Sequence, residues 1–187
     1  MSRLIALTGP AGCGKSTAAA VLEAEGWVRL RFAWPLKAML AAFYDVTGVP
    51  PEEAARRIEG DLKEKRDWHL CGETPRHAMQ TLGTEWGRAC MGRDFWVHAW
   101  RLAAIGALEA GDRVVVEDCR FANEAAAVRA LGGRVVGLHR PGLAPHPSGH
   151  ASEAGVEPDG WVVNDHRTPA PLAAAILRSA RLERASA

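Results

Sequence analysis

The sequence predicts an α/β domain in which a five-stranded parallel sheet is flanked by helices. Short apolar runs alternate with longer amphipathic patterns along the 187 residues, which is the order expected of β-α-β units. Some runs are apolar at every position, as in Val114-Val115-Val116, and this is typical of parallel strands buried on both faces. A glycine-rich turn joins the first strand pattern directly to the first helix pattern. These three observations place the chain in the α/β class.

Five apolar runs are predicted as strands, and seven longer segments are predicted as helices. The strands are Leu4–Thr8, Val28–Arg31, Val114–Glu117, Arg134–His139 and Trp161–Val163. The helices are Lys15–Glu25, Pro35–Tyr44, Pro51–Ile58, Pro75–Cys90, Phe95–Leu108, Ala122–Leu131 and Pro171–Leu182. In the last helix an apolar stripe recurs every three or four residues, which indicates that it packs against the sheet.

The spacing of the strands is uneven and predicts two additions to the sheet. About 80 residues separate the second run from the third, far more than a single crossover helix needs. We therefore expect one domain whose core is formed by residues 1–31 and 112–187, with a helical insertion at residues 32–111. Residues 140–160 are rich in proline and glycine, and we expect this segment to form a lid.

Composition narrows the possible partners and location. The formal net charge is +1, so no overall basic field favours stable nucleic-acid binding. No apolar run approaches the roughly 20 residues that cross a bilayer, and the first residues lack a signal-peptide pattern. The four cysteines form no C-x-x-C pair, which argues against a disulfide framework or a zinc site. We expect a cytoplasmic protein, in the host cytoplasm if it is phage-encoded, that is a monomer or a homodimer.

The glycine-rich turn at residues 9–16 reads GPAGCGKS and matches the P-loop pattern G-x-x-x-x-G-K-[ST] without a gap. Its place between a strand and a helix is the context that confirms this motif. Backbone N–H groups and the helix N-terminus would hold the phosphates, while the lysine would reach the β- and γ-phosphates and the serine would bind Mg²⁺. The expected ATP-binding residues are Gly12, Cys13, Gly14, Lys15, Ser16 and Thr17.

The third strand ends in two carboxylates and is soon followed by an arginine, at Glu117, Asp118 and Arg120. Ligands bind at the carboxyl ends of strands in open parallel sheets, so these residues should share an edge with the P-loop. Asp118 would hold Mg²⁺ through water, and Arg120 would neutralise charge on a transferred phosphoryl group. We expect Lys15, Asp118 and Arg120 to be catalytic, with a surface ion pair as the alternative for Asp118 and Arg120.

The predicted helix Pro75–Cys90 has a polar face opposite its apolar stripe. Arg76, Gln80, Thr84 and Arg88 recur every fourth residue on that face. Two guanidinium groups, an amide and a hydroxyl suit a phosphate together with a base edge. The alternative is an ordinary solvated helix face.

Several blocks of the sequence resemble the bacteriophage-type deoxynucleoside monophosphate kinases, which belong to the P-loop nucleoside monophosphate kinase superfamily. The likeness extends over most of the chain, and the long helical block is its most specific part. The blocks are the P-loop, FAWPLK at 32–37, TPR at 74–76 through QTLGTEWGR at 80–88 to DFWV at 94–97, DCRFANE at 118–124, LGGRV at 131–135, HASE at 150–153 and ND at 164–165.

The resemblance implies a monophosphate-binding side in the helical insertion and a lid motif after the fourth strand. The residues implied for the monophosphate are Lys37, Arg76, Gln80, Arg88, Asp94 and Trp96, and those implied for the lid are His150 and Glu153. Arg120 would clamp a phosphate near the transfer site. Arg31 and His166 depart from the family pattern, which leaves the preferred base open.

The expected reaction is the transfer of phosphate from ATP with Mg²⁺ to a deoxynucleoside monophosphate, which supplies DNA precursors. The acceptor phosphate is already ionised, so positioning and charge neutralisation provide the catalysis. One alternative is a P-loop kinase for another small acceptor such as dephospho-coenzyme A, which would not need the Arg76–Arg88 face. A DNA-associated P-loop ATPase is a further alternative, but the near-neutral charge counts against it.

Overall fold

The computed structural model describes residues 2–143, 156–165 and 168–181, and the chain divides into two compact units. Unit 1 comprises Met1–Phe32 and Trp100–Ala187, and unit 2 comprises Ala33–Ala99. The second unit therefore ends within a helix rather than at residue 111. Trp100 explains where the division falls, because its ring is buried against Phe32 of unit 1, with 4.4 Å between the ring centroids.

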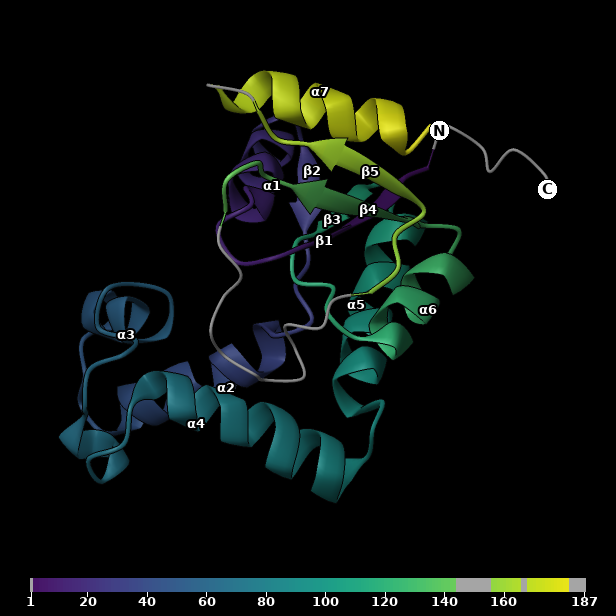
Figure 1. Ribbon diagram of the computed structural model, residues 1–187. Coiled ribbons are helices and arrows are strands. Elements are labelled where there is room, and N and C mark those ends of the chain that lie inside the picture. The colour runs from purple at the N-terminus through teal and green to yellow at the C-terminus, as the bar shows by residue number, and fades with distance from the viewer. Residues whose placement is uncertain (1, 144–155, 166–167, 182–187) are drawn as a thin grey trace. The chain divides into compact units, whose positions relative to one another are not determined.

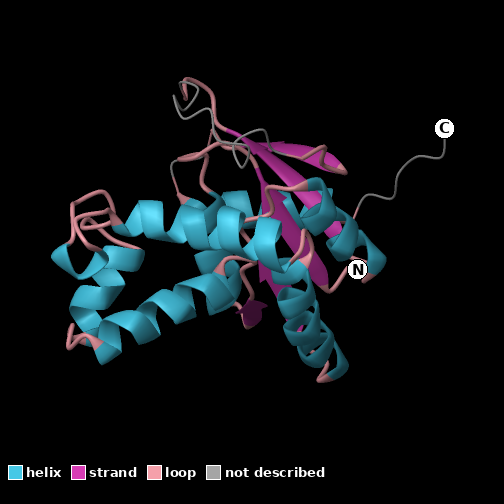
Figure 2. Ribbon diagram, turned by 90° about the horizontal axis from the view of Figure 1, so that it is seen from below, coloured by secondary structure: helices cyan, strands magenta, loops and turns pink. Residues whose placement is uncertain are grey.

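Unit 1 contains every strand that the structure describes, and Figure 2 distinguishes these strands from the helices. Its elements are β1 (Leu4–Thr8), α1 (Lys15–Ala24), β2 (Trp27–Arg29), β3 (Arg113–Val116), α6 (Ala122–Ala130), β4 (Arg134–His139), β5 (Gly160–Val163) and α7 (Pro169–Ser179). A further helix, α5 (Phe95–Glu109), begins in unit 2 and continues into unit 1. Every predicted strand is found, with ends that differ by two residues at most.

The strands form one parallel sheet in the order β2-β3-β1-β4-β5, which confirms the predicted fold class. In the register of the central strand β1 with its neighbour β3, Ala6 pairs with Val116. Residues that follow β1 and β3 consequently leave the sheet at the same edge. This places the P-loop and residues 117–120 at one edge, as the topology of an open parallel sheet requires.

Alternate residues of each strand face opposite layers of helices. Ile5, Leu7 and Val115 belong to a core cluster that also contains residues of α1 and α7. Helix α6 packs against β1 and β4, and it lies with the C-terminal part of α5 on the other side of the sheet (Figure 1). Cover on both sides explains why the central strands are apolar at nearly every position.

The regular elements of unit 2 are all helices or helical turns. Its elements are α2 (Trp34–Val46), α3 (Pro51–Ile58), the 3₁₀ turn η1 (Trp68–Leu70), α4 (Pro75–Thr81), η2 (Leu82–Met91) and the first turn of α5. Its own core contains Leu36, Leu40, Tyr44, Val49, Ala54, Ile58, Met79 and Trp96. The fully buried Tyr44 shows that the core includes a polar group, which needs a hydrogen-bond partner.

The single α-helix predicted for residues 75–90 is wrong beyond Thr81. The chain continues as a π-helix, η2, in which each N–H pairs with the carbonyl five residues earlier instead of four. The indole of Trp96 packs on this segment and donates its N–H to the carbonyl of Gly83 over 2.8 Å. A large side chain inserted beside a helix is one recognised cause of such irregularity. The wider turn breaks the expected four-residue spacing of the polar face.

Candidate functional site

The P-loop follows β1 and ends at the first turn of α1. Lys15 Nζ donates to the carbonyl oxygens of Gly9 and Pro10 over 2.6 and 2.7 Å. Gly14 lies at the N-terminal end of the helix with φ 105°, a left-handed conformation that glycine adopts without strain. The residues expected to bind ATP, 12–17, therefore form one continuous loop and helix start. In this arrangement the backbone N–H groups converge on an anion.

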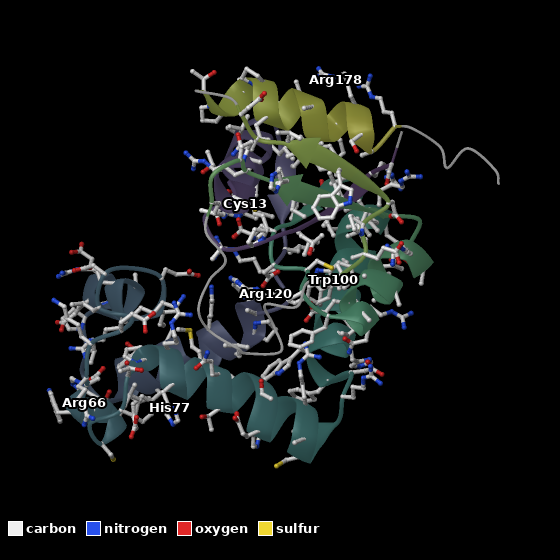
Figure 3. All side chains as sticks on the ribbon, viewed as in Figure 1. Cys13, Arg66, His77, Trp100, Arg120 and Arg178 are labelled. Atoms are coloured by element: carbon white, nitrogen blue, oxygen red, sulfur yellow. The ribbon has the colours of Figure 1, made fainter. Side chains whose placement is uncertain are left out.

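Cys13 lies inside this loop and is fully buried (Figure 3). Its carbonyl oxygen accepts a hydrogen bond from the side-chain amide of Asn164, 2.9 Å away. In the sequence, Asn164 stands out only as part of the ND block at 164–165 that resembles the family. No local sequence signal links it to the P-loop, since 151 residues separate it from Cys13.

Asp118 and Arg120 follow β3 at the edge where the P-loop follows β1. Asp118 Oδ1 accepts a hydrogen bond from the backbone N–H of Phe32 over 3.0 Å, which ties the carboxylate to the segment after β2. Figure 3 labels Arg120, which is half-buried. The structure thus brings Lys15, Asp118 and Arg120, the three residues predicted to be catalytic, to one edge of the sheet.

Glu124 is a buried carboxylate that supports this edge. One of its oxygens accepts from the backbone N–H groups of Arg120 and Phe121, over 2.8 and 3.1 Å. A carboxylate in this position caps the start of α6 and complements the positive end of the helix dipole. It fixes the backbone from which the Arg120 side chain extends.

Glu117 has a different environment from Asp118, although the two are adjacent. Its carboxylate is 6% exposed and pairs with Arg29 and with Arg31, the latter at 2.5 Å. Arg31 departs from the family pattern, and in the structure it pairs with Glu117. These two ion pairs join the end of β2 to the end of β3.

Cys119 is a buried thiol at this edge. Cys119, between Asp118 and Arg120, is 1% exposed. Burial raises the pKa of its thiol well above the usual range, and the negative charges of Glu124 and Asp118 raise it further. Cys119 therefore stays protonated and contributes packing.

Three cationic side chains gather in unit 2, and the sequence reasoning found only two of them. Lys37 is paired with Glu59 at 2.7 Å, and Arg76 is paired with Glu64. The backbone N–H of Arg76 donates to the carbonyl of Lys63 over 3.0 Å, which holds these two segments together. Lys63 is half-buried close to both predicted residues.

The charge balance of this cluster favours an anion. Burial lowers the pKa of Lys63, and the positive charges of Arg76 and Lys37 lower it further, against the opposing effect of Glu59 and Glu64. Lys37 and Lys63 are half-buried and Arg76 is exposed. Like charges held together in this way are stabilised when a dianion such as a phosphate joins them. Lys63 was missed because it lies in the irregular stretch after α3, where no periodicity marks it.

The other residues predicted for the acceptor side differ in exposure. Gln80 and Arg88 are half-buried, and Asp94 is exposed. Trp96 is 3% exposed and packs with Trp86 and Phe95, so its ring lies in the core of unit 2 and offers little surface to a ligand. Because η2 is a π-helix, Arg88 does not continue the α-helical spacing from Gln80.

A buried ionic cluster in unit 2 was also missed. Asp67, 2% exposed, accepts a hydrogen bond from Tyr44 over 2.7 Å and from the His69 backbone over 3.0 Å, and it pairs with Arg57. Burial alone would raise the pKa of Asp67, but the hydrogen bonds from Arg57, Tyr44 and His69 outweigh it and lower that pKa to about 2. This cluster connects α2, α3 and η1.

The predicted lid residues His150 and Glu153 lie outside the described residues. No group of three or more histidine, cysteine or carboxylate side chains within residues 2–143, 156–165 and 168–181 could by itself hold a metal ion. In the same ranges, no helix is both long and apolar enough to cross a membrane.

Comparison with known proteins gives one family. The model of a family described as deoxynucleotide monophosphate kinase matches residues 68–168. A protein of Acanthamoeba polyphaga mimivirus, provisionally named a deoxynucleotide monophosphate kinase, is 32% identical over 160 residues, which cover 78% of this chain and 79% of the relative.

Two solved structures have a similar arrangement at low sequence identity. A mutant of the APS kinase CysC of Mycobacterium tuberculosis is 15% identical with a TM-score of 0.49, covering 95% of this chain and 96% of that chain. A dephospho-CoA kinase from Campylobacter jejuni is 14% identical with a TM-score of 0.45, covering 95% of each chain.

Proposed function

The chain belongs to the deoxynucleotide monophosphate kinase family, and we propose that its P-loop holds ATP with Mg²⁺ while its helical unit holds the acceptor monophosphate. Family membership makes it an enzyme that converts a deoxynucleoside monophosphate and ATP into the diphosphate and ADP. An oxygen of the acceptor phosphate attacks the γ-phosphorus of ATP, and the bond from that phosphorus to the β-phosphate oxygen breaks. No proton has to be removed from an ionised acceptor, so a strong general base is unnecessary.

In unit 1, residues 12–17 supply N–H groups for the ATP phosphates, and Lys15 supplies charge. The ammonium of Lys15 already contacts the loop carbonyls of Gly9 and Pro10, so it exchanges these contacts for phosphate oxygens when ATP binds. Arg120 neutralises charge that develops on the transferred group. Its backbone is held by Glu124, so the guanidinium extends from a rigid helix start.

Ser16 and Asp118 fit a Mg²⁺ that arrives with ATP. Mg²⁺ keeps several waters and binds through a hydroxyl, one or two carboxylates and the substrate phosphates, so a preformed cage of protein ligands is not required. Ser16 is exposed at the start of α1, and Asp118 lies at the same sheet edge. When bound, the ion would neutralise charge on the β- and γ-phosphates.

In unit 2, the cluster of Lys37, Lys63 and Arg76 would hold the phosphate of the acceptor. Glu59 and Glu64 pair with two of these cations, so they would compete with the incoming phosphate and set its affinity. Gln80 would face the base, and Arg88 and Asp94 would complete the acceptor side. Trp96 would act from the core by shaping η2.

The observation that carries the proposal is a P-loop and an arginine at one sheet edge in a chain of this family. A coupled assay of ADP release against a panel of deoxynucleoside monophosphates tests it. We expect ADP release that depends on both ATP and one or more of these monophosphates. ADP release with dephospho-coenzyme A but with no monophosphate would overturn the proposal, as would ATPase activity stimulated by DNA alone.

We further infer that the enzyme acts in the cytoplasm, where its nucleotide substrates are found, without stable binding to nucleic acid. The formal net charge of +1 supports the second point, because sequence-independent DNA binding depends on many phosphate contacts by lysine and arginine. Gel filtration in the presence and absence of duplex DNA tests it, and co-elution at physiological salt would contradict it.

A further inference from the structure

Asn164 joins the end of the sheet to the P-loop. It directly follows β5, and its backbone N–H donates to the carbonyl of His139 at the end of β4 over 2.7 Å. Its side-chain Nδ2 donates to the carbonyl of Cys13 over 2.9 Å. Asn164 is half-buried, so this contact is partly shielded from water. The side chain is therefore held at its base by the sheet and at its tip by the loop.

The contact orients the peptide between Cys13 and Gly14. In a trans peptide the C=O and the N–H point in opposite directions, and the chain contains no cis peptide bond in its described parts. With its C=O directed at Asn164, this peptide directs the Gly14 N–H away from Asn164. The Gly14 N–H belongs to the set of P-loop donors that bind phosphate oxygens.

Gly14 is also the residue that permits the contact. A Cβ at this position would lie 2.5 Å from Asn164 Nδ2 and 3.3 Å from Leu172 Cδ2. The amide therefore packs directly on the glycine backbone, in space that no other residue type would leave. A carboxylate at position 164 would have the same shape, but it accepts hydrogen bonds only and would face the Cys13 carbonyl oxygen without a donor.

We propose that Asn164 is a positioning residue for ATP, which fixes the Cys13–Gly14 peptide so that the Gly14 N–H is ready for a phosphate oxygen. The inference rests on the proposed role of the P-loop as the ATP site. Asn164 acts through the loop and touches no reacting atom. Because unit 2 supplies the acceptor side, loss of the Asn164 amide reduces affinity for ATP and leaves affinity for the monophosphate unchanged.

The test compares Asn164→Asp and Asn164→Ala with the wild type and with Val163→Thr. Val163 precedes Asn164, is 49% exposed and belongs to neither proposed site, so its variant controls for disturbance at the end of β5. Calorimetry measures Kd for a non-hydrolysable ATP analogue with Mg²⁺ and, separately, for the monophosphate that the wild type prefers. Thermal unfolding of each variant is recorded.

We expect the analogue to bind about fivefold more weakly to Asn164→Ala and more than about tenfold more weakly to Asn164→Asp, from the loss of one hydrogen bond and the added repulsion. The Kd for the monophosphate should match that of Val163→Thr, and the Tm should fall by no more than a few degrees, as expected from the loss of one hydrogen bond. Analogue binding within twofold of wild type in both variants would overturn the inference while leaving the proposed function intact. An equal loss of affinity for both ligands would also overturn it, whereas a wild type that binds no ATP analogue would reject the proposed function itself.

Discussion

The indole N–H of Trp96 donates to the carbonyl oxygen of Gly83 over 2.8 Å, and the same ring lies on the backbone of Gly87. A Cβ at Gly87 would be 2.2 Å from the indole nitrogen. The ring is buried with Trp86 and Phe95 and cannot move aside freely. Gly87 thus leaves the space that the Trp96 ring occupies, whereas Gly83 contributes its carbonyl oxygen, and both belong to η2, from which Arg88 extends.

Gly87→Ala is therefore expected to destabilise the protein by roughly 1–3 kcal/mol, as overpacking of a core does. Gly83→Ala is the matched control in the same helix, because its Cβ would meet only Leu36 at an ordinary 3.5 Å. Alanine also has the higher helix propensity, so this control should be neutral or slightly stabilising. Urea unfolding of both variants provides the measurement. Equal stability of the two would show that Trp96 does not constrain η2.

Lys15→Ala should lower kcat/KM by roughly 10²-fold or more while leaving the Tm close to that of the wild type, because charge on the transferred phosphoryl group loses its partner. Arg178→Ala removes an exposed cation on α7 and serves as the control for a general loss of positive charge. Steady-state kinetics with the preferred monophosphate measures both. Near-normal turnover in Lys15→Ala would exclude the P-loop as the catalytic phosphate site.

Lys63→Gln should raise KM for the monophosphate by about tenfold or more and leave KM for ATP within twofold, because it removes one charge-assisted contact to the acceptor phosphate. Lys65→Gln makes the same change at an exposed position two residues away and should alter neither constant. If the two variants behave alike, the cations near Arg76 form an ordinary solvated surface.

Asp67→Asn should reduce stability in a pH-dependent way. The folded-state pKa of Asp67 is about 2, below the ordinary 3.8, so the unfolded chain binds this proton at a higher pH than the native chain. The stabilisation is complete above about pH 4 and is lost as the pH falls toward 2. This pH-dependent part amounts to about 2 kcal/mol. Urea unfolding at pH 7, 5 and 3 measures the free energy of unfolding of each protein. The difference between wild type and variant should be smaller at pH 3 than at pH 7.

Asp61→Asn is the control for that experiment. Asp61 also pairs with an arginine, Arg56 at 2.7 Å, but both side chains are more than half exposed. Exposed pairs contribute little, typically below about 1 kcal/mol, so its variant should unfold nearly as the wild type does at every pH. If the difference in free energy of unfolding between wild type and Asp67→Asn stayed constant with pH, the carboxylate of Asp67 would not be preferentially ionised in the native state.

Local signals were sufficient to predict the sheet, the P-loop and the placement of Asp118 and Arg120. The strands are apolar because they are buried on both faces, and the P-loop pattern is contiguous in the chain. Residues that follow neighbouring parallel strands must emerge at one edge. Both kinds of inference use only a residue's near neighbours in sequence and the geometry common to all parallel sheets.

Tertiary structure alone decided the features that depend on partners distant in the chain. Asn164 contacts Cys13 across 151 positions, and Trp96 donates its indole N–H to the carbonyl of Gly83, 13 positions earlier. Lys63 and Asp67 lie in irregular segments, where their role follows from the charges packed around them. Periodicity reports which face of an element is buried, but only packing determines which side chain reaches which backbone carbonyl or charge.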